Sequence, residues 1–332
     1  MRHSISVVIP VYKGEATLRP VVDELLAQRT IKNLELGIES FISEIILVHD
    51  CGPDDSASTI RALVAQYECV QAVWLSRNFG QHAATLAGIA ASTGDWIVTM
   101  DEDGQHDPRS IGAMLASALD RRLHVVYALG SNRPPHSFVR NLASRTIKVR
   151  LIQLITGGEV TNFSSYRLIL GSLGRTLAAY ASSNVFLDVA ISWISQSIGF
   201  TSTELRRELR TQSGYSTKKL VVHFGRLLLS AGTRPLRLGS LLGFTSFLAG
   251  LVCAVVIVAL RATQGVAITG WASLMTLFLI LGGITQLLLG LVAEYLGIVV
   301  RSSLGRPVYV ATDDPSSSPH LALSHNKQDE AG

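Results

Sequence analysis

The sequence predicts an α/β fold with a mostly parallel β-sheet, followed by two segments able to cross a membrane. Three observations predict it. Strand-like and helix-like segments alternate over residues 4–130, one apolar strand ends in two carboxylates, and two long uncharged runs lie near the C-terminus. Repeated strand–helix units of this length form a parallel sheet with helices on both faces. At 332 residues, the chain can hold two units and an ample core.

The elements of residues 4–130 follow from their apolar patterns. Short apolar runs bounded by Gly, Pro or Asp indicate buried strands, and longer segments with apolar residues three and four apart indicate helices. The expected strands are Ser6–Ile9, Glu44–His49, Gln71–Leu75, Trp96–Met100 and His124–Leu129. The expected helices are Thr17–Gln28, Ala57–Tyr67, Gln81–Ser92 and Arg109–Leu119.

Asp101 and Asp103 directly follow the apolar run Trp96–Met100. Alternate residues of an extended chain share a face, and ligands of open α/β sheets bind at the carboxyl ends of the strands. Two hard oxygen ligands suit Mg²⁺ or Mn²⁺ held jointly with substrate phosphates. The alternative is a polar turn without a metal, because Asp and Gly both favour turns.

Two runs near the C-terminus, Leu238–Leu260 and Trp271–Ala293, carry no charge, and the second stays largely apolar as far as Val300. Each is long enough to cross a hydrocarbon core of about 30 Å. The cationic residues that flank the pair are Arg226, Arg234 and Arg237 on one side and Arg301 and Arg306 on the other. By the positive-inside rule both ends face the cytoplasm, which predicts a transmembrane helical hairpin.

These patterns divide the chain into four parts. A catalytic domain covers residues 1–212, and a basic juxtamembrane segment covers 213–237. The two membrane helices lie within 238–300, at about 238–260 and 271–296, and a cytoplasmic tail covers 301–332. The tail is expected to be partly disordered because it is rich in Ser, Pro and charged residues.

Charge and cysteine content narrow the class of protein. The net charge is +4, and much of the basic surplus lies between Arg121 and Arg237. Such a surface suits phosphates or an anionic membrane, and no aromatic–basic pattern indicates nucleic-acid recognition. The basic amphipathic segment 131–156 either lies on a membrane or is a helix with a solvated face. Three cysteines without metal-type spacing favour a reducing cytosolic setting.

Several motifs, in order, resemble one known family. They are Val7–Tyr12, Leu75–Gly80, Ala87–Gly88, Gly94–Asp95, Asp101–Gln105, Ser213–Leu220, Glu294–Gly297 and Arg306–Tyr309. Together they resemble the family 2 inverting glycosyltransferases of the GT-A fold. Within that family the chain is most similar to the membrane-bound polyisoprenyl-phosphate glycosyltransferases, such as dolichol-phosphate mannose synthase and its bacterial undecaprenyl-phosphate relatives. The resemblance covers about residues 4–310.

The resemblance implies a nucleotide-sugar donor and a divalent metal ion, Mg²⁺ or Mn²⁺. Asp101, Asp103 and Gln105 would hold the ion against the donor diphosphate. The residues implied to contact the rest of the donor are Pro10, Tyr12 and Glu15 in the nucleoside pocket, Asp50 at the base and ribose, and Arg77 at the nucleoside or phosphate.

The resemblance also implies a polyprenyl-phosphate acceptor. Arg133 and Arg140, with Ser144, stand where the family binds the acceptor phosphate, and Arg210 or Arg207 stands near a loop arginine that touches the diphosphate. Arginine suits this role because its planar guanidinium presents several donors at once. Attraction to the membrane surface alone is the alternative role for each of these arginines.

The sequence departs from the family pattern after the second expected strand, where His49-Asp50-Cys51-Gly52 replaces Asp-Asp-Gly-Ser, and after the first, where Lys13-Gly14-Glu15 replaces Asn-Glu-Glu. These departures leave the nucleotide and the sugar open. They leave the implied reaction class unchanged.

The leading hypothesis is therefore transfer of a sugar to polyprenyl phosphate at the cytosolic face of the bacterial inner membrane, for envelope glycan or lipid modification. An anionic phosphate acceptor needs no general base. One alternative is a saccharide hydroxyl acceptor, which does need a base; Asp188 is then a candidate. A second alternative is a non-catalytic membrane subunit, against which the intact Asp101, Asp103 and Gln105 set argues. A homo-oligomer, dimer or tetramer, stays open.

Overall fold

The computed structural model describes residues 2–33, 38–131, 164–181, 187–206, 270–303 and 307–317, with scattered positions between 244 and 259. The chain divides into two compact units. The first contains Met1–Lys148, Val160–Tyr215 and Pro307–Gly332, and the second contains Val149–Glu159 and Ser216–Arg306. Residues from Pro307 onwards thus belong to the first unit, and the four predicted parts of the chain stay predictions.

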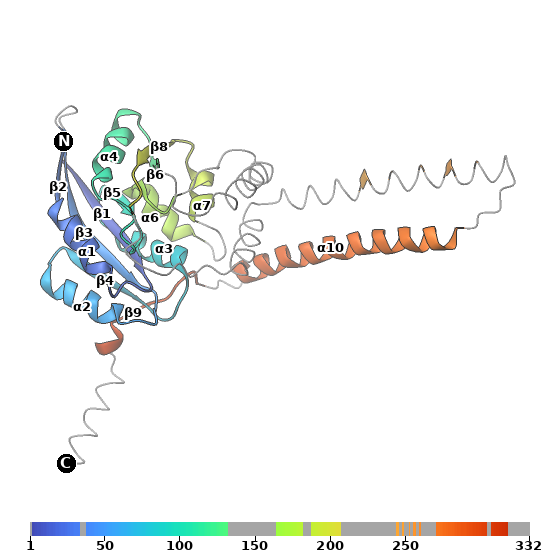
Figure 1. The fold of residues 1–332 in the computed structure, drawn as a ribbon, viewed down its shortest axis with the longest axis horizontal. Coiled ribbons are helices and arrows are strands. Elements are labelled where there is room, and N and C mark those ends of the chain that lie inside the picture. The colour runs from blue at the N-terminus through green and yellow to red at the C-terminus, as the bar shows by residue number, and fades with distance from the viewer. Residues whose placement is uncertain are drawn as a thin grey trace, which may run out of the picture. The chain divides into compact units, whose positions relative to one another are not determined.

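A mostly parallel sheet forms the first unit (Figure 1), as the sequence predicts. Among the described residues the strand order is β8-β6-β7-β5-β1-β3-β4-β9, with β2 paired to β3. β1 pairs in parallel with β3 and β5, whereas β7 runs antiparallel between β5 and β6. The strands are β1 Arg2–Val11, β2 Thr30–Asn33, β3 Ile38–His49, β4 Val70–Leu75, β5 Trp96–Thr99, β6 Val125–Gly130, β7 Arg167–Leu170, β8 Ile198–Thr203 and β9 Ala311–Thr312.

Helices cover both faces of this sheet, which gives two separate apolar cores. Because side chains alternate along a strand, Val7 and Ile9 of β1 pack on the face of α1, α2 and α4, and Val8 packs on the face of α3, α6 and α7. The helices are α1 Leu18–Ala27, α2 Ser56–Gln66, α3 Gln81–Ala91, α4 Ser110–Asp120, α6 Gly171–Tyr180 and α7 Leu187–Ile194. Burial on both faces is the usual setting of parallel strands.

All five predicted strands and all four predicted helices of residues 4–130 are present, with shifted ends. The largest shift is at β3, which begins at Ile38 instead of Glu44 because its first residues pair with the start of β1, Glu39 with Arg2. Cross-strand pairing of this kind depends on a partner far along the chain. Single-sequence periodicity therefore locates the middle of a strand better than its ends.

The chain returns to the sheet after the second unit. Residues 307–317, here called the C-terminal strap, add β9 to the edge of β4, where Trp74 pairs with Thr312. The Ser76 amide donates to the Val310 carbonyl oxygen at 3.0 Å, and the Val308 side chain packs on the core. β4 would otherwise end the sheet with unpaired backbone groups. The sequence predicts a partly disordered tail here, because two paired residues are too short to show a strand pattern.

An ion pair fastens the strap. Arg61 of α2 donates from Nε to Asp314 Oδ2 and from Nη2 to Asp314 Oδ1, both at 2.8 Å. Hydrogen bonding from Arg61 lowers the pKa of the Asp314 carboxyl below its ordinary value. A lowered folded-state pKa means that the contribution is present at neutral pH and is lost as pH falls through that pKa.

Arg61→Ala is expected to loosen the strap without unfolding the domain. Both side chains are partly exposed, and an ion pair near the surface contributes about 1 kcal/mol or less. Thermal unfolding should therefore change little, while the amides that pair β9 with β4 exchange faster with solvent. Hydrogen exchange read by mass spectrometry measures this. Arg19→Ala is the matched control, because Arg19 of α1 donates a hydrogen bond to the neutral side chain of Gln66, which lies on α2 like Arg61. Wild-type exchange in Arg61→Ala would show that the ion pair does not hold the strap.

The second unit contains one long described helix, α10, over the 33 residues Trp271–Ser303. Its sequence is the second apolar run. Large apolar side chains are exposed along it, namely Leu274, Leu277, Phe278, Leu281, Leu289, Val292, Leu296, Val299 and Val300. Counted over the described positions, no helix is both long and apolar enough to cross a membrane. The first predicted membrane segment, Leu238–Leu260, lies almost wholly outside the described residues.

Candidate functional site

The candidate site lies where four parallel strands end. The carboxyl ends of β1, β3, β4 and β5 share one edge of the sheet, and chain direction places ligands of such sheets at that edge. Tyr12 follows β1, Asp50 follows β3, Arg77 follows β4, and Asp101 follows β5. The topology thus gathers these predicted residues at one end of the domain.

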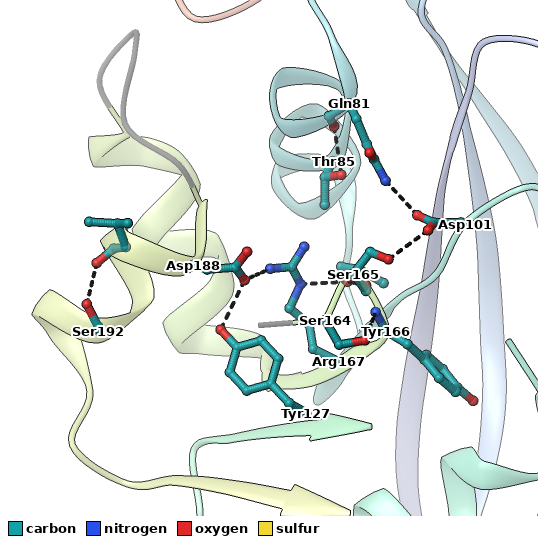
Figure 2. Close-up of polar contacts among 12 residues, drawn as sticks. Gln81, Thr85, Asp101, Tyr127, Ser164, Ser165, Tyr166, Arg167, Asp188 and Ser192 are labelled. Carbon is teal, nitrogen blue, oxygen red and sulfur yellow. Dashed lines mark hydrogen bonds and ion pairs between the residues drawn. The ribbon is translucent and has the colours of Figure 1, made fainter. Parts of the chain in front are cut away.

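Asp101 is held by neutral hydrogen-bond donors from two other elements (Figure 2). Gln81 Nε2, at the start of α3, donates to Oδ1 at 2.6 Å, and Ser165 Oγ, just before β7, donates to Oδ2 at 2.7 Å. The Asp101 backbone amide donates to Nδ1 of the buried His106 at 3.1 Å. These donors fix the direction of the carboxylate and add no positive charge. Its capacity to hold a cation is therefore kept.

Asp103 and Gln105 are joined by a tight turn. The Gln105 amide donates to Asp103 Oδ1 at 3.0 Å, and Gly104 between them has a φ of 75°. That left-handed conformation is easily reached by glycine. The polar turn that the sequence offers as an alternative to a metal site is therefore present. The two interpretations are compatible.

The donor chemistry of Asp101, Asp103 and Gln105 fits a hard cation. Their side chains can offer only oxygen from carboxylates and an amide, which suits Mg²⁺ or Mn²⁺ and does not suit a zinc site of His and Cys. No group of three His, Cys, Asp or Glu side chains forms a metal cage within the part of the chain that the structure describes. A cation here would need further oxygen ligands from phosphates or water, as Mg²⁺ usually does.

Glu102, between the two aspartates, turns its carboxylate to the chain that follows β1. It accepts from the Tyr12 amide at 2.9 Å and from the Lys13 amide at 3.0 Å. A side chain at Gly14 would come within 2.9 Å of it. Glu102 has no role predicted from the sequence. In an extended chain Glu102 would point away from the face that Asp101 and Asp103 share, and this alternation was the available sign of a separate role.

Glu102→Ala is expected to release the loop after β1. Removing an acceptor from two amides costs about 1–3 kcal/mol when they are left unpaired, so unfolding in urea shifts to lower concentration, and amides at residues 12–14 exchange faster. Glu102→Gln keeps one acceptor oxygen and should fall between alanine and wild type. Equal stability and exchange in all three proteins would remove this role.

Two residues predicted to face the nucleoside use their carboxylates to hold loops. Asp50, which is 3% exposed, accepts from the Phe79 amide at 2.7 Å and from the Gly80 amide at 2.9 Å. Burial raises the pKa of Asp50 above its ordinary value, against the two amide bonds that lower it. Glu15 accepts from the Asp55 amide at 3.1 Å. Their predicted contacts with a nucleoside stay predictions.

Of the other predicted donor contacts, Tyr12 and Arg77 are better placed for a ligand than Pro10. Tyr12 is 41% exposed, whereas Pro10 lies buried within β1. The Arg77 guanidinium lies 4.0 Å from the centre of the Phe79 ring, so a planar cation is presented beside the loop that Asp50 holds. Stacking of this kind limits the motion of an otherwise flexible arginine.

A buried polar network lies behind Asp101 (Figure 2). Arg167 forms an ion pair with Asp188, and its Nε donates to Thr99 Oγ1 at 2.9 Å. Tyr127 donates its hydroxyl to Asp188 at 3.0 Å, and burial raises the pKa of Tyr127 to about 12. Thr99 Oγ1 in turn donates to the Ser165 carbonyl oxygen at 2.7 Å. Ser165, which orients Asp101, is thus tied to the network.

Asp188 was the candidate base for a hydroxyl acceptor. Its Oδ1 is paired with Arg167 and also accepts from the Tyr127 hydroxyl, so this carboxylate oxygen is already engaged within the protein.

A small polar cavity adjoins these groups, with a volume of about 120 Å³. Its walls come from α3, β7 and α7. The lining residues are Gln81, His82, Thr85, Ser164, Ser165, Arg167 and Asp188. Sequence reasoning missed all of these except Asp188, because they join the site only through the fold.

The predicted contacts for the acceptor and the diphosphate are not described by the structure. Arg133, Arg140, Ser144, Arg207 and Arg210 lie outside the described residues. They stay predictions.

Comparison with known proteins adds sequence relatives that match nearly the whole chain. Residues 6–174 match the family model "Glycosyl transferase family 2". A protein of Serratia proteamaculans named undecaprenyl-phosphate 4-deoxy-4-formamido-L-arabinose transferase is 31% identical, over 98% of this chain and 97% of that protein. A protein of Pseudomonas aeruginosa with the same name is 32% identical, over 95% and 92%.

Among solved structures, glucosyl-3-phosphoglycerate synthase of Mycobacterium tuberculosis in complex with phosphoglyceric acid has a TM-score of 0.50 at 18% identity, over 70% of this chain and 80% of that chain. The same synthase with Mn²⁺, UDP-glucose and phosphoglyceric acid has a TM-score of 0.50 at 17% identity, over 70% and 79%. At these identities the likeness is one of fold.

Proposed function

Because the chain belongs to glycosyl transferase family 2, we propose that it transfers a sugar from a nucleotide-sugar donor to undecaprenyl phosphate, for modification of the cell envelope. The observation that carries the proposal is the oriented Asp101 carboxylate beside the Asp103 turn, at the carboxyl edge of the parallel strands. The names of relatives about 31% identical over nearly the full chain support the acceptor.

The proposed reaction is an inverting displacement. An oxygen of the acceptor phosphate attacks the anomeric carbon, and the bond from that carbon to the diphosphate oxygen breaks. A divalent cation, when bound, neutralises the departing nucleoside diphosphate. Asp101, Asp103 and Gln105 would hold it, and Gln81 and Ser165 keep Asp101 in place. The acceptor is already anionic, so no proton has to be removed by Asp188.

The cations that complete the site are proposed from the sequence. Arg133 and Arg140, with Ser144, would bind the acceptor phosphate, and Arg210 or Arg207 would contact the donor diphosphate. Arginine pairs with phosphate through two parallel hydrogen bonds, which fixes orientation as well as charge. Each of these residues precedes the apolar runs in the sequence.

The membrane anchor is also proposed. Two helices, about 238–260 and 271–296, would form a hairpin in the bacterial inner membrane with the catalytic domain on the cytoplasmic side. The two uncharged runs of the sequence support this, since each is long enough to cross a hydrocarbon core of about 30 Å. Exposed apolar side chains along α10, such as Phe278 and Leu289, support it as well.

Arg133→Ala and Arg140→Ala are each expected to raise KM for undecaprenyl phosphate about tenfold or more, because a charge-assisted hydrogen bond to phosphate is lost. The KM for the sugar nucleotide should change little. Steady-state kinetics with each substrate varied separately measures this. Arg29→Ala, at an exposed site before β2, is the control. An unchanged lipid KM in both variants would contradict the assignment.

The proposed function is tested with detergent-purified protein, undecaprenyl phosphate, and Mn²⁺ or Mg²⁺. A panel of UDP-, GDP- and dTDP-sugars is supplied, and lipid-linked sugar is detected by mass spectrometry. We expect one new polyprenyl-phosphate sugar that disappears with EDTA. No lipid product with any donor, but nucleotide release once glycan acceptors are added, would replace the proposal with transfer to a saccharide hydroxyl.

A further inference from the structure

Glu102 connects two parts of the candidate site. In the chain it lies between Asp101 and Asp103, the two carboxylates proposed to hold the cation. Its own oxygens accept from two successive backbone amides of residues 12–14, at 2.9 and 3.0 Å. These residues, here called the β1 loop, include Tyr12, which is predicted to line the nucleoside pocket. A cation at the two aspartates would therefore adjoin, on both sides, the residue that holds this loop.

The two ends of the β1 loop are held by different parts of the fold. At its end, Gly14 leaves space for the carboxylate, since a Cβ there would come within 2.9 Å of Glu102 Oε2. The Gly14 amide donates to Ser56 Oγ at 3.3 Å, and the Glu15 amide that follows donates to Asp54 Oδ2 at 3.1 Å. The first half of the loop is thus held by the residue between the cation ligands, and the second half by the start of α2.

Three carboxylates in succession repel one another when all are ionised. The side chains that donate to Asp101, Gln81 and Ser165, are neutral and do not offset this repulsion. A divalent cation between Asp101 and Asp103 would offset it, and would also restrict the backbone on both sides of Glu102. Both effects favour the conformation in which the Glu102 carboxylate reaches the β1 loop. A second ligand that needs the same ordering then binds more tightly.

We propose that Glu102 is a positioning residue that transmits occupancy of the cation site to the β1 loop, so that the cation tightens the hold on the nucleoside as well as on the diphosphate. The inference rests on the proposed function and specifies how two parts of its donor site are coupled. Such coupling is reciprocal, so a nucleoside held by the β1 loop raises the affinity for the cation by the same factor. Glu102 acts here through the loop and is not itself a catalytic residue.

The first test fills the cation site without a nucleoside. The probe is Mn²⁺ with inorganic diphosphate, which has no base or ribose to contact Tyr12, and calorimetry on the full-length protein in detergent verifies that it is bound. Hydrogen exchange is then read at single amides. We expect the Tyr12 and Lys13 amides to exchange about fivefold more slowly with the probe, and the Glu15 amide, which is bonded to Asp54, to be unchanged. Unchanged exchange at Tyr12 and Lys13, or equal slowing at Glu15, overturns the inference.

Variants break the connection from either side. In Glu102→Ala and in Gly14→Ala the probe should no longer slow exchange in the β1 loop, whereas Glu102→Gln, which keeps an acceptor oxygen, should retain part of the effect. Glu68→Gln, in an exposed turn before β4, controls for the loss of one negative charge and should respond as wild type does. Thermal unfolding checks that each variant is folded, and the two Glu102 variants suffice if Gly14→Ala is not. A wild-type response in Glu102→Ala would show that the connection does not run through Glu102.

Affinity distinguishes transmission from simple support of the loop. The Kd of the nucleoside diphosphate whose sugar is accepted in the panel above is measured by calorimetry. In Glu102→Ala it should rise about fivefold or more with Mn²⁺ present, and less than about twofold when EDTA replaces the metal. A loop that Glu102 supports regardless of the cation would give the same rise in both conditions, and that result overturns the inference.

These measurements also separate the inference from the proposed function. Lipid product from a protein whose β1 loop does not respond to Mn²⁺ removes the inference and keeps the function. A β1 loop that responds to Mn²⁺ and diphosphate through Glu102, without lipid product from any donor, keeps the inference and removes the undecaprenyl-phosphate acceptor. Protein that binds neither Mn²⁺ with diphosphate nor any nucleoside diphosphate overturns both.

Discussion

Replacing Asp103 by alanine is expected to abolish metal-dependent sugar transfer while leaving the fold intact. Asp103 lies in the turn after β5, outside both apolar cores, so its side chain has little share in packing. Loss of a charged oxygen ligand removes electrostatic stabilisation of several kcal/mol from the leaving diphosphate, and about 4 kcal/mol is a rate loss of roughly a thousandfold. Product formation over a Mn²⁺ titration measures it.

The control for this variant is Asp120→Ala, which removes a carboxylate at the exposed end of α4. Both proteins should show the thermal unfolding of wild type, and only Asp103→Ala should lose activity at every metal concentration. Activity that survives in folded Asp103→Ala would refute the metal role. Activity that returns at high Mn²⁺ would show that Asp103 sets affinity and that Asp101 carries the chemistry.

Breaking the buried Arg167–Asp188 pair is expected to have the largest effect on stability. Removing one partner leaves an uncompensated charge in the interior, which costs about 3–5 kcal/mol. Asp188→Leu and Arg167→Met should therefore each lower the free energy of unfolding by that amount. Replacing both partners, in Arg167→Met/Asp188→Leu, should recover most of the loss, because an apolar pair carries no desolvation penalty. Urea unfolding of the three variants measures this.

Tyr127→Phe measures the contribution of a single neutral hydrogen bond in the same network. It removes one hydrogen bond to Asp188 and leaves both charges in place, so a loss of about 1 kcal/mol is expected. If the loss in free energy of unfolding of the double variant equals the sum of the losses of the two single variants, the two charges do not stabilise the fold as a pair. Packing of the two side chains would then account for the loss.

The predicted elements and the site were visible in the sequence to different degrees. The strands and helices of residues 4–130, apart from the short antiparallel strand β2, were predictable because burial on both faces of a parallel sheet leaves plain apolar runs. Asp101 and Asp103 were visible because a strand directly precedes them. The placement of β7 between β5 and β6 could not be predicted, since a short apolar segment does not reveal which strands it will pair with.

The residues that support Asp101 were hidden for the same reason. Gln81 lies 20 residues from Asp101 and Ser165 lies 64 residues away, and neither stands out by type or spacing. Asp50 and Glu15 show the opposite case. Both are acidic residues just after strands, as a ligand contact would be, yet each carboxylate accepts from a backbone amide. Sequence marks where a polar group stands but not which partner it takes.

The C-terminal strap sets the order in which the protein can be finished. β4 gains its edge partner β9 only after the whole of α10 has been translated. At ~5–20 residues per second, on the order of ten seconds or more pass before the partner strand exists. A nascent or prematurely terminated chain therefore carries an open β4 edge, which is a feature that promotes aggregation. The sheet of the first unit can therefore be completed only once α10 has been translated.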